Sequence, residues 1–185
     1  MKEYSGALEY DPYDVCPEYQ SAHFCLRLVT MDDAAGLLEC YKNASISVQA
    51  NAHNCTFGYG SQTLDEMREC VKLWLDAYKG RGFIRFAIIS GVEENPVGTV
   101  EIFGSAPGDF SILRIDIEGS YEEKLPLDEL IKIADSFFSD IGCAAIATRA
   151  VPEAKGRLDA LRLNGYKPFP PSGDWDGEHY YIKYA

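Results

Sequence analysis

The chain has 185 residues, 46% of them hydrophobic and 25% charged, a composition that suits one globular domain and excludes a largely disordered chain. Seventeen basic residues against 29 acidic ones give a formal net charge of −12, which repels phosphates, so we expect neither nucleic acid nor membrane as a partner. No apolar run approaches the roughly 20 residues that span a membrane, and residues 1–8 lack the apolar stretch of a secretory signal, so we expect a cytoplasmic protein.

Residues 1–23 form an acidic arm that precedes a single domain at residues 24–185. The arm carries one lysine, five acidic residues and four tyrosines, and we expect it to lie on the domain surface, with a partner-binding tail as the alternative. The domain opens with an alternating strand at 24–29 (FCLRLV). Thr30 and the two acidic residues after Met31 then predict a helix N-terminus, and an apolar stripe at helical spacing follows.

The periodic spacing of apolar residues is lost between residues 43 and 62, where Asn, Ser and Gly dominate. This predicts a loop, and loops of this length are usually functional or mobile. Thr63 and Glu66 form a capping box at the start of a second helix, which ends at Gly80. Three β segments follow, and the short turns between them predict an antiparallel meander: 83–89, 97–103 and 111–117.

The last third of the chain continues the alternation of helices and strands. A third helix is expected from Pro126 to Ile141, and an apolar run after Gly142 reads as a strand buried on both faces. Pro152 should open a fourth helix, before two final strands at 166–169 and 180–184. The predicted fold class is α/β (α+β): a mixed, mostly antiparallel sheet of six or seven strands flanked by about four helices.

The six cysteines form no Cys-x-x-Cys pair and show no zinc-ligand spacing with the three histidines, so we expect no metal site. We expect at least five of them to be buried free thiols, with Cys55 in the polar loop as the exception.

This order of elements resembles that of the GNAT acyltransferase superfamily over residues 24–185. The resemblance rests on the opening at 26–34 (LRLVTMDDA), the strand at 97–101 (VGTVE), and the Gly165-Tyr166 pair where the family usually ends its fourth helix in Gly-Phe. The asparagine-rich loop and the strand at 83–88 (FIRFAI) resemble a bacterial subgroup.

The resemblance implies transfer of an acetyl group from acetyl-CoA to an amine. A central strand, here 113–117, splays away from its neighbour at 144–150, and the thioester lies in the gap. Backbone amides near Ile115 and Ile117 would hold the pantetheine and polarise the thioester carbonyl. A carboxylate would accept the proton of the amine, and three acidic residues lie on suitable strands as candidate bases: Glu101, Asp116 and Glu118. The competing interpretation pairs Asp116 with Arg114 or Arg149 as a surface charge.

The chain departs from the family pattern at the loop that binds pyrophosphate. The expected Arg-x-x-Gly-x-Gly is replaced by Glu122, Leu125 and Leu127, and an acid at the position of the arginine repels phosphate. The resemblance assigns donor binding to the rest of this loop and to the basic fourth helix, which would supply the missing charge: Ser120, Tyr121, Lys124, Lys155 and Arg157. The alternative for the last two is a solvated helix face.

A second departure concerns the leaving thiolate. The family's fourth helix commonly carries an asparagine and then a tyrosine that protonates the thiolate, and these positions hold Ala154 and Leu161. Water or another tyrosine would have to serve, because the usual tyrosine is absent.

The acceptor would be an amine of a small molecule or peptide, and the acidic character of the chain favours a cationic one. The polar loop between the first two helices is the candidate acceptor pocket, with these residues to orient the amine: Asn51, His53, Asn54 and Tyr59. The alternative is a loop whose side chains bond among themselves. The function predicted is N-acetyl transfer by a monomer or homodimer; the alternative is a catalytically silent module of the same fold that does not use CoA.

Overall fold

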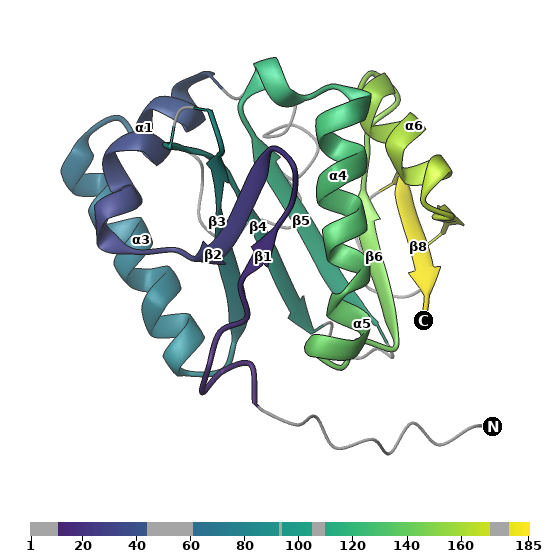
Figure 1. Ribbon diagram of the computed structural model, residues 1–185, viewed down its shortest axis with the longest axis horizontal. Helices are drawn as coiled ribbons and strands as arrows, with labels where there is room; N and C mark the ends of the chain where they lie inside the picture. The colour runs from purple at the N-terminus through teal and green to yellow at the C-terminus, as the bar shows by residue number, and fades with distance from the viewer. Residues whose placement is uncertain (1–10, 44–60, 93, 105–109, 171–177) are drawn as a thin grey trace.

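The computed structural model describes residues 11–43, 61–92, 94–104, 110–170 and 178–185. Eight strands form one sheet in the order β1-β2-β3-β4-β5-β6-β8-β7 (Figure 1). The strands are β1 (Tyr19–Gln20), β2 (Phe24–Leu28), β3 (Phe83–Ser90), β4 (Pro96–Gly104), β5 (Ser111–Ile117), β6 (Ala145–Arg149), β7 (Lys167–Phe169) and β8 (Tyr180–Tyr184). The α-helices are α1 (Ala34–Asn43), α3 (Leu64–Lys79), α4 (Lys124–Asp135), α5 (Phe137–Asp140) and α6 (Lys155–Leu163).

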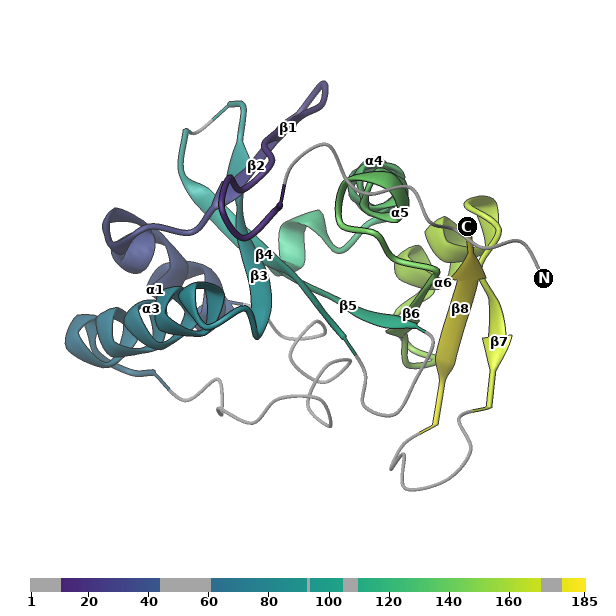
Figure 2. The same ribbon diagram turned by 90° about the horizontal axis from the view of Figure 1, so that it is seen from below.

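The helices lie on both faces of the sheet (Figure 2). Helices α1 and α3 pack on one face, where they bury an apolar cluster that includes Leu37, Val71 and Ala87. Helices α4 and α6 pack on the other face over a larger apolar cluster, to which α5 contributes Phe137. Because successive side chains of a strand point to opposite faces, each central strand contributes to both layers.

The first two of the four predicted helix starts are confirmed by reciprocal capping. Thr63 and Glu66 form a capping box that opens α3, and α3 ends at Gly80. Thr30 and Asp33 form another, which opens a short 3-10 turn before α1. Two helix bounds differ from the prediction: the expected third helix is interrupted at Ser136, and α6 begins at Lys155, after a turn, rather than at Pro152.

The sheet confirms the predicted meander and the predicted splay. Strands β2 to β5 pair antiparallel in succession. Strand β6 is parallel to β5, and the two pair only at Ser111–Ile146 and Ile112–Ala147 before they diverge. The sheet has eight strands rather than six or seven because a two-residue strand of the arm, β1, adds to the edge beside β2.

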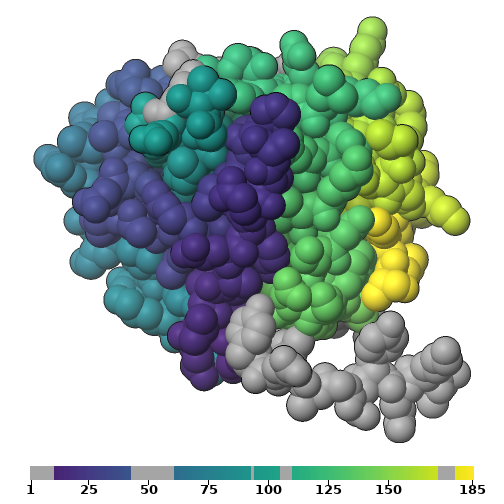
Figure 3. Space-filling view, in the orientation of Figure 1, coloured from purple at the N-terminus to yellow at the C-terminus, as the bar shows by residue number. Residues whose placement is uncertain are grey.

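The described part of the arm lies on the domain. Tyr13 stacks against Tyr78 at the end of α3, with ring centroids 5.6 Å apart. Arg81 holds Asp11 at 2.6 Å, and Tyr19 packs on Phe137 with ring centroids 5.4 Å apart. In Figure 3 this segment forms a purple band between the blue helices and the green α4.

The cysteines are less buried than the composition suggested. Cys16, Cys25, Cys40, Cys70 and Cys143 are free thiols, but only Cys40 and Cys143 are fully buried, and the other three are half-buried. The expectation of five buried thiols is therefore wrong for three, while Cys55 lies outside the described residues. Within the described ranges, no helix is both long and apolar enough to cross a bilayer.

Candidate active site

The divergence of β5 and β6 creates the central feature of the candidate site. Beyond Ile112 and Ala147 the two parallel strands no longer pair, so the backbone of β5 at Ile115 faces a gap rather than a neighbouring strand. The side chains of Ile115 and Ile117 point away from this gap into the apolar cluster beneath α4. The side chains of these two predicted donor-binding residues therefore belong to the core, so that a role in donor binding would fall to their backbone groups.

Arg157 of α6 reaches into this gap. Its side chain is 2% exposed, and its Nη2 atom donates a hydrogen bond to the carbonyl oxygen of Ile115 at 2.9 Å. The same guanidinium binds Glu122 twice, from Nε at 2.7 Å and from Nη2 at 2.8 Å. Glu122, the acid that stands where the family has an arginine, is therefore neutralised by Arg157. The alternative of a solvated helix face is wrong for Arg157, because its side chain is buried.

The first turn of α6 lies directly on the loop that precedes α4. A Cβ atom added to Gly156 would lie 3.0 Å from the backbone nitrogen of Lys124 and 3.1 Å from the carbonyl oxygen of Glu122. Only glycine allows this close approach of two backbones. In this arrangement the guanidinium of Arg157 lies beside β5 and bonds to the carbonyl oxygen of Ile115.

The other predicted donor-binding residues surround this contact. Lys124 and Lys155 are exposed and remain available to an anionic ligand. Ser120 is exposed, and its hydroxyl donates to the carboxylate of Glu118 at 3.1 Å. Tyr121 is half-buried: its ring packs edge-on against Phe24, and its hydroxyl lies 3.3 Å from that of Ser90.

The face of the sheet that α1 and α3 cover carries a buried row of charged side chains. Arg85 of β3, Glu101 of β4 and Arg114 of β5 are register partners, and each is at most 4% exposed. Glu101 forms ion pairs with both arginines, with Arg85 through a short hydrogen bond and with Arg114 at 3.2 Å. Asp116, fully buried on the same face, lies 3.7 Å from Arg85. The interpretation of Asp116 as a surface charge is therefore wrong. We call these four residues the charge row.

Two side chains from the helices complete the environment of Arg85. Trp74 of α3 stacks on its guanidinium, 4.2 Å from ring centroid to Cζ. Tyr41 of α1 lies 2.8 Å from the hydroxyl of Thr99, which in turn accepts a hydrogen bond from Arg85 at 3.2 Å. Burial raises the pKa of Tyr41, so its hydroxyl stays protonated. Arg85, Tyr41 and Trp74 were not predicted as site residues; a charge inside the apolar strand FIRFAII was the available signal.

Glu118 differs from the other two candidate bases. It follows the last residue of β5 at the mouth of the gap and is half-exposed. Within the described part of the chain it makes no ion pair, and its carboxylate accepts one hydrogen bond, from Ser120. Of the three predicted carboxylates, this one retains access to solvent and free acceptor capacity.

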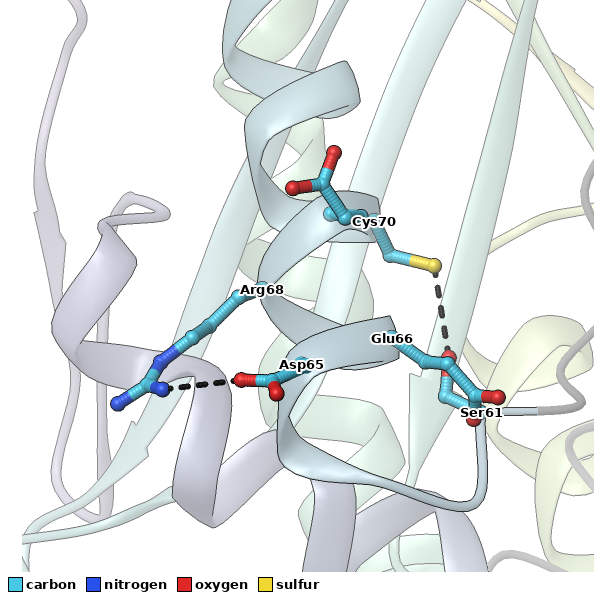
Figure 4. Close-up of a pocket in the computed structure, with 6 residues that line it drawn as sticks. Ser61, Asp65, Glu66, Arg68 and Cys70 are labelled. Atoms are coloured by element: carbon cyan, nitrogen blue, oxygen red, sulfur yellow. Dashed lines mark hydrogen bonds and ion pairs between the residues drawn. The ribbon is translucent and has the colours of Figure 1, made fainter.

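The predicted acceptor residues Asn51, His53, Asn54 and Tyr59 lie outside the described residues. A hollow beside the end of that loop is lined by Ser61 and the first turns of α3 (Figure 4). Two pairs of its side chains interact: Asp65 pairs with Arg68 at 3.2 Å, and the hydroxyl of Ser61 lies 3.4 Å from the thiol of Cys70. Backbone hydrogen bonds from Gln62 and Thr63 lower the pKa of Glu66. The contacts in this hollow therefore stabilise the start of α3.

Comparisons with known proteins support this description of the fold. No family model and no curated protein matches the sequence. Solved structures do match: a ribosomal-protein-S5-alanine acetyltransferase from Vibrio fischeri has a TM-score of 0.68 at 14% identity, covering 91% of this chain and 96% of that one. A GNAT-family acetyltransferase from Bacillus anthracis has a TM-score of 0.66 at 16% identity, covering 91% and 98%. The chain has the GNAT fold.

A third match extends the comparison to a ligand complex. A ribosomal L7/L12 α-N-protein acetyltransferase, solved with coenzyme A, has a TM-score of 0.66 at 10% identity and covers 91% of this chain and 98% of its own. In the present chain, the two faces of the sheet beside the gap between β5 and β6 carry different charged groups. The ion pair of Arg157 and Glu122 lies at the gap below α4 and α6, and the charge row lies on the face of α1 and α3.

Proposed function

We propose that this protein is an N-acyltransferase that transfers an acetyl group from acetyl-CoA to a primary amine of a small molecule or peptide. The observation that carries the proposal is the divergence of the parallel strands β5 and β6 beyond Ile112 and Ala147. An extended thioester arm needs such a gap, with strand backbone on one side to hydrogen-bond its amide groups. When bound, acetyl-CoA supplies the acetyl carbonyl that the amine attacks.

The chain's own residues would divide the work as follows. The backbone of β5 at Ile115 and Ile117 holds the donor arm and polarises the carbonyl, because preorganised backbone dipoles stabilise the oxyanion that develops. The loop residues Ser120, Tyr121 and Lys124 and the exposed Lys155 line the route to the surface, where the two lysines attract phosphate. Leu161, 1% exposed, cannot protonate the departing thiolate; water serves, since a thiolate leaves readily near neutral pH.

Glu118 is the candidate that best suits the role of general base. Glu101 and Asp116 form ion pairs with buried arginines. We infer that these ion pairs hold β4 and β5 in place rather than accept a proton. Glu118 lies at the mouth of the gap with solvent access, so a bound amine or a water can reach it. Activity should therefore rise with pH through the pKa values of the base and of the amine.

The acceptor is expected to be cationic before it loses its proton. The net charge of −12 raises the local concentration of amines near the protein. Asn51, His53, Asn54 and Tyr59 would orient the amine with neutral donors and acceptors, which hold a charged substrate without trapping it as a tight ion pair. Whether the protein acts as a monomer or a homodimer does not enter this mechanism.

A second candidate function is favoured by one observation. Arg157 fills the gap that the donor would occupy, and this arrangement suits a silent module of the same fold that binds a ligand or partner without CoA. Calorimetric titration with acetyl-CoA separates the two functions. Binding supports the enzyme; no heat and no thermal shift at millimolar ligand would establish the silent module instead.

If acetyl-CoA binds, activity is measured by release of CoA with a panel of amines. Glu118→Gln should lower kcat/KM by about 100-fold at neutral pH and flatten its rise with pH. Glu153→Gln is the matched control, because Glu153 is exposed in the turn before α6 and should leave the profile unchanged. An unaltered pH profile in Glu118→Gln would assign the base elsewhere.

A further inference from the structure

We propose that Arg157 and Glu122 form a latch that closes the donor gap, and that an anionic donor opens it by drawing Arg157 away from Glu122. This inference rests on the proposed function, because it concerns how the same gap admits its ligand. It assigns to Arg157 two alternating partners: the carboxylate of Glu122 in the closed state and the phosphates of the donor in the open state.

The closed state joins three separate elements through one side chain. Arg157 comes from α6, Glu122 from the loop before α4, and Ile115 from the diverging part of β5. All three hydrogen bonds of the guanidinium are short, between 2.7 and 2.9 Å, and the side chains of the ion pair are 2% and 3% exposed. The guanidinium therefore ties α6 to β5 and to the loop before α4.

Backbone packing makes this closure tight. Gly156 brings the first turn of α6 to within contact distance of the backbone at Lys124, at the N-terminal end of α4. Asn164, at the other end of α6, donates to Asp128 of α4 at 2.8 Å. The two helices thus meet along their length, and a ligand that enters between them must separate the end that Arg157 holds.

The chemistry of the pair makes an exchange of partners favourable. A buried ion pair contributes little net stability, because desolvation of both charges offsets much of their attraction. The Nη1 atom of Arg157 is buried and, among the described residues, has no hydrogen-bond partner. Phosphate presents several oxygens to the planar fork of an arginine and binds it bidentately. A donor phosphate can therefore replace the carboxylate and also satisfy the vacant N–H group.

The latch has a measurable consequence for affinity. When the closed state predominates, the apparent dissociation constant of the ligand exceeds the intrinsic one in inverse proportion to the open fraction. Weakening the closed state without removing Arg157 should therefore tighten binding. Glu122→Gln does this, because it keeps the size of the side chain and removes the charge that competes with phosphate.

The primary test is calorimetric titration of CoA into the native protein, Glu122→Gln and the control Asp159→Asn. Asp159 pairs with Arg162 on the exposed side of the same helix, at 3.6 Å, so its loss leaves the latch intact. We expect Glu122→Gln to bind CoA at least about tenfold more tightly than the native protein, and Asp159→Asn to match the native affinity within about twofold. Equal or weaker binding by Glu122→Gln would overturn the latch.

A second measurement follows the native protein and needs a variant only to assign one resonance. The Nε–H group of Arg157 donates to Glu122, and its resonance can be assigned by its loss in Arg157→Lys. Saturating CoA should shift this resonance as the guanidinium changes partner. CoA binding with an unmoved resonance would overturn the latch but leave the proposed function standing, whereas no CoA binding to either the native protein or Glu122→Gln would overturn both.

Discussion

Replacing Glu101 with glutamine tests how the charge row contributes to stability. The substitution keeps the shape of the side chain and removes one negative charge. Among the described residues, the arginines Arg85 and Arg114 then face the carboxylate of Asp116, and none of these side chains is more than 4% exposed. The interior gains a net positive charge that solvent cannot screen.

The expected magnitude follows from this burial. Removing one partner of a buried ion pair typically costs about 3–5 kcal/mol, because the remaining charge stays desolvated. For a chain of this length, 1 kcal/mol lowers the Tm by about 2–4 °C, so the Tm of Glu101→Gln should fall by about 6–20 °C. Replacing Arg114 with methionine in the same protein restores charge balance, so the double variant should lose less than the sum of the two single variants.

Thermal and urea unfolding followed by circular dichroism provide the assay. Glu39→Gln is the matched control: Glu39 is 72% exposed and pairs with Lys42 at 3.4 Å on the surface of α1. Exposed pairs are worth at most about 1 kcal/mol, so this variant should lie close to the native protein. If Glu101→Gln were as stable as Glu39→Gln, the charge row would have to be hydrated, and the reasoning from burial would be refuted.

Three further predictions concern packing, pH and thiol reactivity. Gly98→Ala should lower the free energy of unfolding by at least about 2 kcal/mol in urea titrations, because the added Cβ would overlap the carbonyl oxygen of Asp116; an unchanged midpoint would contradict this. Burial by itself would raise the pKa of Asp33, but hydrogen bonds from Arg27 and the backbone outweigh it and hold the pKa below its usual value. The resulting stability is present above the ordinary carboxyl pKa and is lost as pH falls through the folded one. Asp33→Asn should therefore cost about 2 kcal/mol at pH 7 and progressively less as the pH falls below the ordinary carboxyl pKa; a loss that does not change with pH would refute the assignment. Burial raises the pKa of Cys40 to about 12, so iodoacetamide should label it only after unfolding, and labelling in the native state as fast as that of the half-buried thiols would contradict its burial.

The sequence by itself determined the parts of this protein that depend on neighbouring residues. The capping box of Thr63 and Glu66 placed the start of α3, and Gly80 placed its end. Alternating side chains and short turns predicted the meander of β3 to β5. These features could be predicted because capping, turn chemistry and periodicity act over a few residues and are written directly in the order of side chains.

Only the tertiary structure decided the partners of the charged residues. Glu122 and Arg157 lie 35 positions apart, and no local pattern in the sequence links them. Arg85, Glu101 and Arg114 meet because the strand register places them opposite one another. The sequence alone therefore identified Glu101 and Asp116 as candidate bases, whereas their burial beside arginines favours a structural role. The role of a charged side chain depends on its burial and on the opposite charge that lies beside it. Both are determined only when segments distant in the sequence pack together.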